Sequence, residues 1–283
     1  MKKGAYIVTG ATGGIGGAIA RRLVADGVET LILACRNDSK AAALAGSLRA
    51  HAPASPTRIE AAHLDLASQA SVRAFADTMA GRQIAALINN AGIMPGKVSL
   101  TADGIESATA TNVVGTTLLT ELMLPAIVDG GAIVMTTSVT RRIVRLRADW
   151  LEHAAAYHGF LHRFKTYGRS KLVLTHYAAD LARRLADRNI RVNCADPGVV
   201  DSGIISLGIP VLDRMADVFF RPLISTPDEG ANAALSALRS PHTTMIYSPS
   251  GRCKPIPDAY MQDPMHDRTI AQLIEAAGLW RAG

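Results

Sequence analysis

The chain has 283 residues, of which 48% are hydrophobic and 24 are glycine, and it carries a formal net charge of +6. This composition excludes a disordered chain and favours a compact α/β protein with a substantial core. The basic residues are dispersed and accompany no nucleic-acid-binding motif, so we expect a solvated basic surface and no nucleic-acid partner. No uncharged apolar run reaches the roughly 18 residues that a membrane span needs, so no transmembrane segment is expected.

The three cysteines, Cys35, Cys194 and Cys253, are far apart in the sequence. Their number and spacing indicate neither a disulfide framework nor a metal site, which is typical of a reducing compartment. The charged N-terminal tripeptide is followed by an apolar run that ends at Thr9 in a glycine-rich turn, which argues against a signal peptide. We therefore expect a cytoplasmic protein without a metal.

The first motif is a strand, a glycine-rich turn and a helix. Residues 5–9 form a short β-branched apolar run, the turn Thr9-Gly-Ala-Thr-Gly-Gly-Ile-Gly16 follows, and an amphipathic helix then ends at Gly27. Glycines let the backbone approach a pyrophosphate, and the helix N-terminus offers free N–H groups. The spacing is G-x-x-x-G-x-G rather than G-x-G-x-x-G, and a plain tight turn is the alternative. The expected cofactor contacts here are Gly10, Thr12, Gly13, Gly14, Ile15 and Gly16.

The end of the second strand, residues 30–34, indicates which dinucleotide binds. An acidic residue near this point would bind the ribose hydroxyls of NAD, but Arg36 and Asn37 occupy it. Because arginine can clamp a 2′-phosphate, we predict NADP(H) as the cofactor, with a free surface arginine as the alternative.

Strands and helices alternate along the rest of the chain, which predicts a parallel sheet covered on both faces. No repeat or linker interrupts this pattern, so residues 1–283 are interpreted as a single domain. A capping box with proline at the first helical position begins another helix at Thr226. We expect further strands at 58–64, 84–88, 132–136, 190–195 and 245–247, and helices at 38–50, 68–80, 105–126, from Tyr167 to about Arg188, and 267–277.

Tyr167 and Lys171 lie four residues apart and so share one face of a helix. A cation beside a phenol lowers the phenol pKa from about 10, which gives a proton donor and acceptor usable near neutral pH. The spacing alone equally fits an amphipathic helix with a surface lysine whose stem covers apolar side chains.

Taken in order, the motifs resemble those of the classical short-chain dehydrogenase/reductases. The most similar branch is the retinol dehydrogenase-like and protochlorophyllide reductase-like one, through Leu33-Ala-Cys-Arg-Asn37, Gly251-Arg-Cys-Lys254 and a gap of 29 positions between Ser138 and Tyr167. The matching pieces are Thr9-Gly10-x-x-x-Gly14-x-Gly16, Asn89-Asn90-Ala91-Gly92, Asn112, Ser138, Tyr167-x-x-x-Lys171 and Pro197-Gly198.

This resemblance implies a Rossmann-type α/β fold with a seven-stranded parallel sheet, and it implies catalytic roles for four residues. Tyr167 would be the general acid/base, and Lys171 would lower its pKa and hold the nicotinamide ribose. Ser138 would hydrogen-bond the substrate oxygen, and Asn112 would anchor a water in a proton relay. The further cofactor contacts that it implies are Asp65 and Leu66 at the adenine, Asn89, Asn90, Ala91 and Gly92 along the groove, and Pro197, Gly198, Val200 and Ser202 near the nicotinamide.

Two segments have more than one interpretation. The insertion 139–166 contains Arg141, Arg142, Arg145 and Arg147, which fit either a basic rim for a substrate carboxylate or phosphate or a solvated, partly helical flap. The apolar segment 199–226 is interpreted as a substrate lid, with a place in the core as the alternative.

We therefore predict an NADP(H)-dependent alcohol dehydrogenase or carbonyl reductase that acts on a small hydrophobic molecule. A catalytically silent NADP-sensing or scaffold protein is the first alternative, and four retained catalytic positions argue against it. A sugar-nucleotide epimerase or dehydratase shares Tyr-x-x-x-Lys but usually has a larger C-terminal domain. A homodimer, through the helices around Asn112 and Tyr167, and a monomer, in which the insertion blocks that contact, are equally expected.

Overall fold

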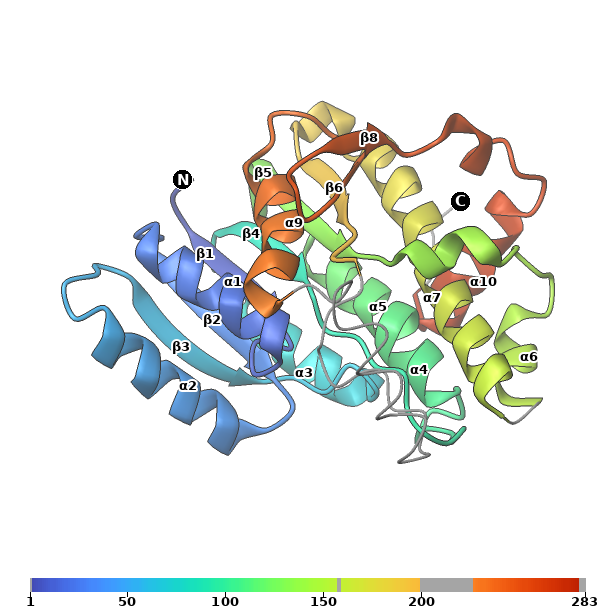
Figure 1. Cartoon of the computed structure of the whole chain (residues 1–283), viewed down its shortest axis with the longest axis horizontal. Helices are drawn as coiled ribbons and strands as arrows, with labels where there is room; N and C mark the ends of the chain where they lie inside the picture. The colour runs from blue at the N-terminus through green and yellow to red at the C-terminus, as the bar shows by residue number, and fades with distance from the viewer. Residues whose placement is uncertain (1, 157–158, 199–225, 280–283) are drawn as a thin grey trace.

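The computed structural model describes residues 2–156, 159–198 and 226–279, and its described strands form one sheet (Figure 1). The strand order is β3-β2-β1-β4-β5-β6-β7-β8. The strands are β1 (Ala5–Thr9), β2 (Thr30–Cys35), β3 (Arg58–His63), β4 (Ile84–Asn89), β5 (Ile127–Thr136), β6 (Arg191–Ala195), β7 (Met245–Tyr247) and β8 (Cys253–Pro255). The predicted Rossmann-type fold with seven parallel strands is confirmed for β1 to β7.

The eighth strand is a correction to the sequence-based prediction. β8 pairs antiparallel with β7 at the sheet edge, with Tyr247 opposite Cys253. The chain reverses between them through Gly251, whose φ of 76° lies in the left-handed region that glycine adopts without strain. Three residues ending in a proline are too short and irregular to stand out as a strand in a sequence.

Helices cover both faces of the sheet. The helices are α1 (Gly14–Ala25), α2 (Asp38–His51), α3 (Gln69–Thr78), α4 (Ser107–Thr109), α5 (Gly115–Met123), α6 (Trp150–Ala156), α7 (Phe160–Arg184), α9 (Pro227–Arg239) and α10 (His266–Ala276). Shorter turns are the π-helix η1 (Ala110–Val114) and the 3₁₀ turns η2 (Val139–Ile143), η3 (Ala186–Arg188) and η5 (Asp258–Tyr260). The buried residues of α1, α2 and α9 pack on one face, and those of α3, α5, α7 and α10 belong to the core of the other face.

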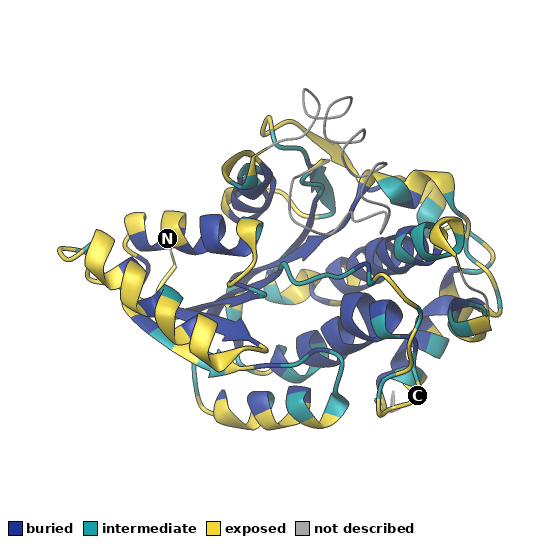
Figure 2. Ribbon diagram, turned by 60° about the horizontal axis from the view of Figure 1, so that its bottom comes forward, coloured by how far each residue is buried: buried dark blue, intermediate teal, exposed yellow. Residues whose placement is uncertain are grey.

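The β1 strand shows how one short run serves both cores. Successive side chains of a strand point to opposite faces, so Ile7 joins the core under α5 and α7 while Tyr6 and Val8 join the core under α1 and α9. All five residues of β1 are buried, as a strand covered on both faces requires (Figure 2).

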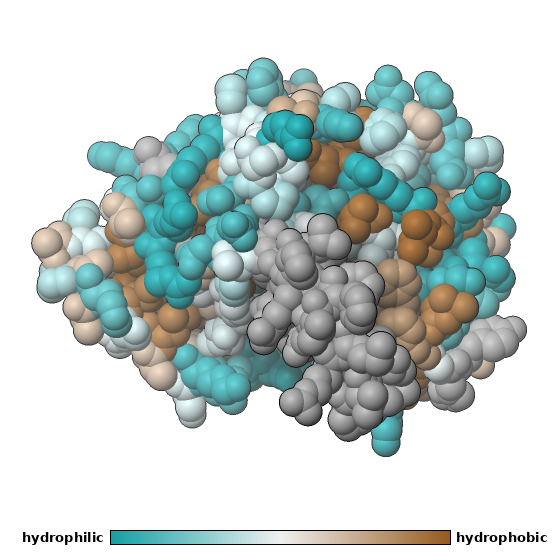
Figure 3. All heavy atoms as spheres, in the orientation of Figure 1, coloured by the Kyte–Doolittle hydropathy of each residue, from teal (hydrophilic) through white to brown (hydrophobic). Residues whose placement is uncertain are grey.

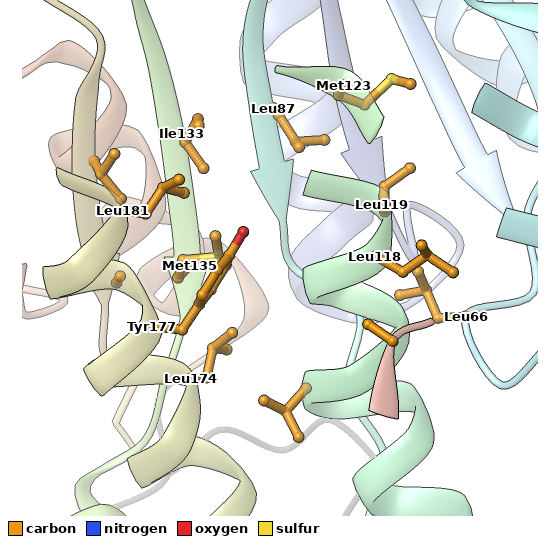
Figure 4. Packing of buried hydrophobic residues seen from close by; sticks show 14 of the residues in the cluster. Leu66, Leu87, Leu118, Leu119, Met123, Ile133, Met135, Leu174, Tyr177 and Leu181 are labelled. Carbon is orange, nitrogen blue, oxygen red and sulfur yellow. The ribbon is translucent and has the colours of Figure 1, made fainter. Parts of the chain in front are cut away.

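The long helix α7 is fixed to the sheet by an apolar stripe. Leu174, Tyr177 and Leu181 recur at helical spacing and face Ile133 and Met135 of β5 (Figure 4). Burial of each such leucine stabilises the fold by about 1.5–3 kcal/mol. This packing fixes the position of α7 against β5.

The helix predicted for residues 105–126 is interrupted in the structure. It consists of α4, the π-helical turn η1 and α5, and Asn112 lies in the middle of η1. The Asn112 amide exchanges hydrogen bonds with the backbone of Ile93, which accounts for the extra residue in this turn. Single π-helical turns of this kind are frequent at functional sites.

The start of α9 follows its predicted capping box. The Thr226 hydroxyl accepts the Glu229 N–H at 3.2 Å, and the Glu229 carboxylate accepts the Thr226 N–H at 2.7 Å.

Within the described parts of the chain, no helix has the length and apolar character needed to cross a membrane.

A buried histidine pair joins α7 to the C-terminal helix. His176 Nδ1 and His266 Nδ1 are 3.0 Å apart, and the His176 ring stacks on Tyr260 with a centroid distance of 4.7 Å. Burial, reinforced by His266 and partly opposed by Asp263, lowers the pKa of His176 from 6.5 to about 4.

The lowered pKa of His176 in this buried pair predicts that the folded protein loses stability in acid. Between pH 6.5 and about 4 the unfolded chain binds a proton that folded His176 does not, so the free energy of unfolding should fall by up to about 3 kcal/mol as the pH drops. His176→Phe keeps the stacked ring and should flatten this pH dependence in urea unfolding. The exposed His51→Gln is the matched control. An unchanged slope in His176→Phe would contradict the assignment.

Candidate active site

A groove of about 430 Å³ lies at the carboxyl ends of the central strands, where open α/β sheets bind their ligands. The predicted cofactor contacts that line it are Gly10, Thr12, Gly13, Gly14, Ile15, Gly16, Arg36, Asn37, Asp65, Leu66, Asn90, Ala91 and Gly92. Residues that sequence reasoning missed also line it, namely Thr9, Ala34, Lys40, Leu64, Ile93 and Thr111.

The glycine turn fits a dinucleotide pyrophosphate. A Cβ added at Gly16 would lie 2.3 Å from the Gly10 carbonyl oxygen and 2.8 Å from Ala11 Cα, so only glycine allows the turn to close this tightly. Gly13 caps α1 without a side-chain hydrogen bond, which leaves the N–H groups of the first turn available to an anion. The groove therefore has the backbone donors that a pyrophosphate requires.

The adenosine end of the groove carries two cationic side chains. Arg36 is exposed at the end of β2, and Lys40, one helical turn further on in α2, lines the same space. The Asn37 side chain caps α2 by accepting the Lys40 N–H at 2.8 Å, so its oxygen is already engaged. Lys40 could have been found in the sequence from its position four residues after Arg36.

Asn89 is a correction to the predicted groove. Its side chain is buried, donates to Thr120 Oγ1 at 3.0 Å and contacts Met135 Sδ, so it lies in the core and not in the groove. It is the last residue of β4, and alternation along the strand sends its side chain toward the helices. Asn90, by contrast, lines the groove and donates to the Thr9 carbonyl oxygen at 3.0 Å.

Three of the four predicted catalytic side chains meet beside β5. Ser138 lies two residues after the end of β5, and its side chain interacts with that of Tyr167 on α7. One turn later Lys171 is buried, with its Nζ 5.7 Å from the centre of the Tyr167 ring and donating to the Thr136 carbonyl oxygen at 2.8 Å. Strand β5 and helix α7 thus supply one polar cluster.

Gly92 connects this cluster to the groove. A Cβ at Gly92 would lie 3.1 Å from Lys171 Nζ and 3.5 Å from Asn112 Oδ1. The chain at Gly92 therefore passes over both groups, and a larger residue would push the lysine away. A ligand in the groove would reach the lysine at this point.

The Asn112 side chain acts as a brace. Its Oδ1 accepts the Ile93 N–H at 2.7 Å, and its Nδ2 donates to the Ile93 carbonyl oxygen at 2.8 Å and to Ser170 Oγ at 3.2 Å. One fully buried amide thereby joins the loop after β4, the turn η1 and helix α7. Its water-anchoring role stays a prediction.

The expected lowering of the Tyr167 pKa is not present in the protein alone. Burial raises the pKa of Tyr167 to about 12, and the hydrogen bond with Ser138 opposes this only in part. Burial also lowers the pKa of Lys171 from 10.5 to about 8. Burial, which no sequence pattern specifies, is the main cause of the raised Tyr167 pKa, and the Lys171 ammonium lies 5.7 Å from the ring centre and donates to the Thr136 carbonyl oxygen. At neutral pH Tyr167 therefore carries its proton.

A buried ion pair supports the serine turn. Arg141 Nη1 donates to Asp196 Oδ2 at 2.7 Å and to the Ser138 carbonyl oxygen at 2.7 Å. Arg141 is therefore a brace between η2 and the loop after β6, and not part of a basic rim. Arg147 forms two hydrogen bonds with Asp149.

Exposed apolar side chains lie on η2, which begins directly after Ser138, and at the start of α7, the helix that carries Tyr167. Ile143 of η2 and Leu161 at the start of α7 are 65% and 63% exposed, and Val139 and Phe160 are also exposed. Hydrophobic atoms gather on this side of the molecule, to the right of the grey segment in Figure 3.

Some predicted residues are not brought into the groove. Gly198 lines a second cavity, and Pro197 lines neither the groove nor that cavity. Val200, Ser202 and all but one residue of the predicted lid 199–226 lie outside the described residues.

The glycine-lined groove and the Ser138, Tyr167 and Lys171 cluster define a Rossmann-type dinucleotide-binding protein with an acid/base site. The chain belongs to the short-chain dehydrogenase family, whose model matches residues 5–147. It is 32% identical to human polyprenol dehydrogenase over 245 residues, which cover 83% of this chain and 72% of that protein. It is 34% identical to human retinol dehydrogenase 12 over 236 residues, which cover 81% of this chain and 71% of that protein.

Solved structures agree with this assignment. An uncharacterised protein from Mycobacterium paratuberculosis superposes with a TM-score of 0.75 at 27% identity, covering 98% of this chain and 94% of that one. A short-chain dehydrogenase from Burkholderia cenocepacia in complex with NADP superposes with a TM-score of 0.64 at 26% identity, covering 87% and 95%. The predicted family and its retinol dehydrogenase-like branch are confirmed.

The buried lysine predicts a stability gain on its removal. Lowering the pKa of Lys171 to about 8 means that its charge costs about 3 kcal/mol at pH 7, a cost that disappears only above pH 10.5. Lys171→Met loses one hydrogen bond, worth about 1 kcal/mol, and should be up to about 2 kcal/mol more stable without cofactor. Urea unfolding at pH 7 measures this. Lys165→Met, exposed on the same helix, is the control, and a loss above about 1 kcal/mol in Lys171→Met would refute the argument.

Proposed function

We propose that this protein is an NADP(H)-dependent oxidoreductase that interconverts an alcohol and a ketone or aldehyde by hydride transfer on a hydrophobic substrate. The observation that carries the proposal is the Ser138, Tyr167 and Lys171 cluster at the mouth of a glycine-lined groove. The cofactor supplies the hydride, so the protein need only position and polarise the carbonyl group.

The residues divide the remaining work in the direction of reduction. The Tyr167 hydroxyl, protonated at neutral pH, gives its proton to the carbonyl oxygen as charge develops there. The Ser138 hydroxyl hydrogen-bonds the same oxygen, and Arg141 holds the serine turn in place. The Lys171 ammonium, next to Gly92, would stabilise negative charge and would hold the nicotinamide ribose of a bound cofactor.

The hydrophobic substrate class is supported by the apolar approach and by the relatives. Exposed Ile143 and Leu161 lie on η2 and α7, the elements next to Ser138 and Tyr167, and an apolar substrate body would cover such side chains. Polyprenol and retinol, in the names of the relatives, are both apolar alcohols. Each methylene group of the substrate that becomes buried would contribute about 0.8 kcal/mol to binding.

A silent cofactor-sensing protein is the weaker alternative. Lys171 is buried without a carboxylate partner among the described residues, which lowers its pKa and costs stability. Binding of the dinucleotide alone does not require a tyrosine such as Tyr167 beside this lysine.

The catalytic assignment predicts a large loss of turnover in Tyr167→Phe. General acid catalysis contributes about 10²–10⁴-fold, so kcat for carbonyl reduction should fall by at least about 10²-fold. Tyr167 does not line the groove, so the variant should still bind NADPH. Fluorescence of the bound cofactor measures this binding. Ser138→Ala should lose less than Tyr167→Phe because the proton source remains.

Tyr6→Phe is the matched control, since that hydroxyl donates to the Lys2 carbonyl oxygen in the other core. Its kcat should match the parent's. Turnover of Tyr167→Phe within threefold of the parent, with NADPH bound normally, would remove Tyr167 from the mechanism and favour the silent alternative.

The cofactor preference is tested at Arg36. A charge-assisted phosphate contact is worth about 1.5–3 kcal/mol, so Arg36→Asp should shift the ratio of NADPH to NADH affinity by at least about tenfold toward NADH. Arg268→Asp on α10 makes the same change in net charge away from the groove and should leave the ratio unchanged. Equal affinity of the parent for both cofactors would sink the NADP(H) proposal.

A further inference from the structure

A second cavity, of about 720 Å³, opens beside the catalytic serine. Resting on the proposed function, we propose that it binds an anionic group, a carboxylate or a phosphate monoester, at the far end of an apolar carbonyl substrate. The cavity is formed by η2, the loop after β6 and the β7–β8 hairpin, so it lies at the carboxyl ends of the last strands of the sheet.

Three cationic side chains from separate segments line this cavity. Arg142 comes from η2, Arg252 from the turn of the hairpin and Lys254 from β8. All three are exposed, and none forms an ion pair with an acidic side chain in the described part of the chain. Like charges that converge on one cavity raise its positive potential and favour an anion there.

Among the described residues that line the cavity, Asp196 is the one carboxylate, and it is already neutralised. Asp196 Oδ2 accepts from the Arg141 guanidinium at 2.7 Å, and Asp196 Oδ1 accepts the Gly198 N–H at 3.3 Å. Asp196 neutralises the charge of Arg141, whereas Arg142, Arg252 and Lys254 add three further positive charges to the lining. The net charge of the lining therefore attracts an anion.

Most of the other lining residues are apolar and fit the body of a ligand, and Ser248 is a polar exception. Val139, Ile246, Pro249 and Pro257 contribute to it, and Tyr260 adds an aromatic face. The volume lies within the range of about 300–1,000 Å³ usual for small-molecule sites. An apolar wall with a few cations suits an amphipathic anion better than a neutral polar ligand.

The cavity is coupled to the catalytic turn. Val139 lines it and follows Ser138 directly, and Arg141 joins the cavity wall to the Ser138 carbonyl oxygen. A substrate whose carbonyl reaches Ser138 and Tyr167 can therefore extend its other end toward the hairpin. The β7–β8 hairpin, at the sheet edge in Figure 1, thus gains a role in substrate choice.

The test compares three aldehydes with the same ten-carbon body: 10-oxodecanoate, its methyl ester and 10-oxodecyl phosphate. With NADPH, the parent should show a KM for an anion at least about fivefold below that for the ester, as one charge-assisted contact provides. The carboxylate and phosphate arms show which anion the cavity prefers. Arg252→Gln and Lys254→Gln should each raise the KM for the preferred anion about fivefold and leave that for the ester within twofold.

Arg145→Gln, exposed on the insertion but not in the cavity, is the matched control and should change none of these values. Calorimetry of decanoate against decanamide, with NADP⁺ present, gives a readout that needs no turnover. Decanoate should bind more tightly, and both hairpin variants should abolish the difference.

The failures are distinguishable. Equal KM values for the acids and the ester in the parent overturn the anion site and leave the oxidoreductase proposal standing. Absence of any reduction overturns the proposed function, and the calorimetric preference then decides the anion site alone. Hairpin variants that raise the KM values for all three substrates equally also overturn the anion site. Such a result would mean that the substitutions disturb the structure and do not remove a contact with a charged group.

Discussion

The active-site end of this protein depends on a lysine buried without a carboxylate partner among the described residues. Lys171 is 2% exposed, and its ammonium donates to the Thr136 carbonyl oxygen at the end of β5. Burying a charge in this way costs several kcal/mol of effective desolvation unless hydrogen bonds compensate. Hydrophobic packing of α7 on the sheet provides the stability that offsets this cost, through Leu174, Tyr177 and Leu181 (Figure 4).

Two polar braces keep the elements around the lysine in register. Asn112 ties the loop after β4 to α7, and Arg141 ties the serine turn to the loop after β6. Each brace uses backbone carbonyl or N–H groups that would otherwise be buried without partners, so its removal would leave unsatisfied polar groups as well as a loosened turn. These side-chain contacts add to the backbone hydrogen bonds that continue just beyond the strand ends, from the Thr137 N–H to the Ala195 carbonyl oxygen and from the Asp196 N–H to the Tyr247 carbonyl oxygen.

Most of the fold followed from local sequence patterns, because each buried strand is a short apolar run and each turn has its own residue signature. The strand at 5–9, the glycine turn and the capping box at Thr226 were predicted for physical reasons that do not depend on distant residues. β8 and the π-helical turn η1 were not predicted. Their causes lie far away in the chain, in the pairing with β7 and in the bonds between Asn112 and Ile93.

The candidate site shows the same limit more sharply. Spacing pointed to Tyr167 and Lys171, and the family resemblance added Ser138. The resemblance also placed Asn89 in the groove, and neither pointed to Lys40. Asn89 and Asn90 are neighbours whose side chains point to opposite sides, so a motif read as a block necessarily misplaces one of them.

Burial also sets the protonation state of two side chains of the site before any ligand binds. Burial holds the pKa of Tyr167 at about 12 and that of Lys171 at about 8, so both groups are mainly protonated at neutral pH. This is the state that donates a proton to a carbonyl oxygen. Oxidation of an alcohol requires the phenolate, which needs positive charge closer than an ammonium 5.7 Å from the ring centre. In the proposed mechanism, either Lys171 would leave the Thr136 carbonyl oxygen or a bound ligand would bring that charge before an alcohol could be oxidised.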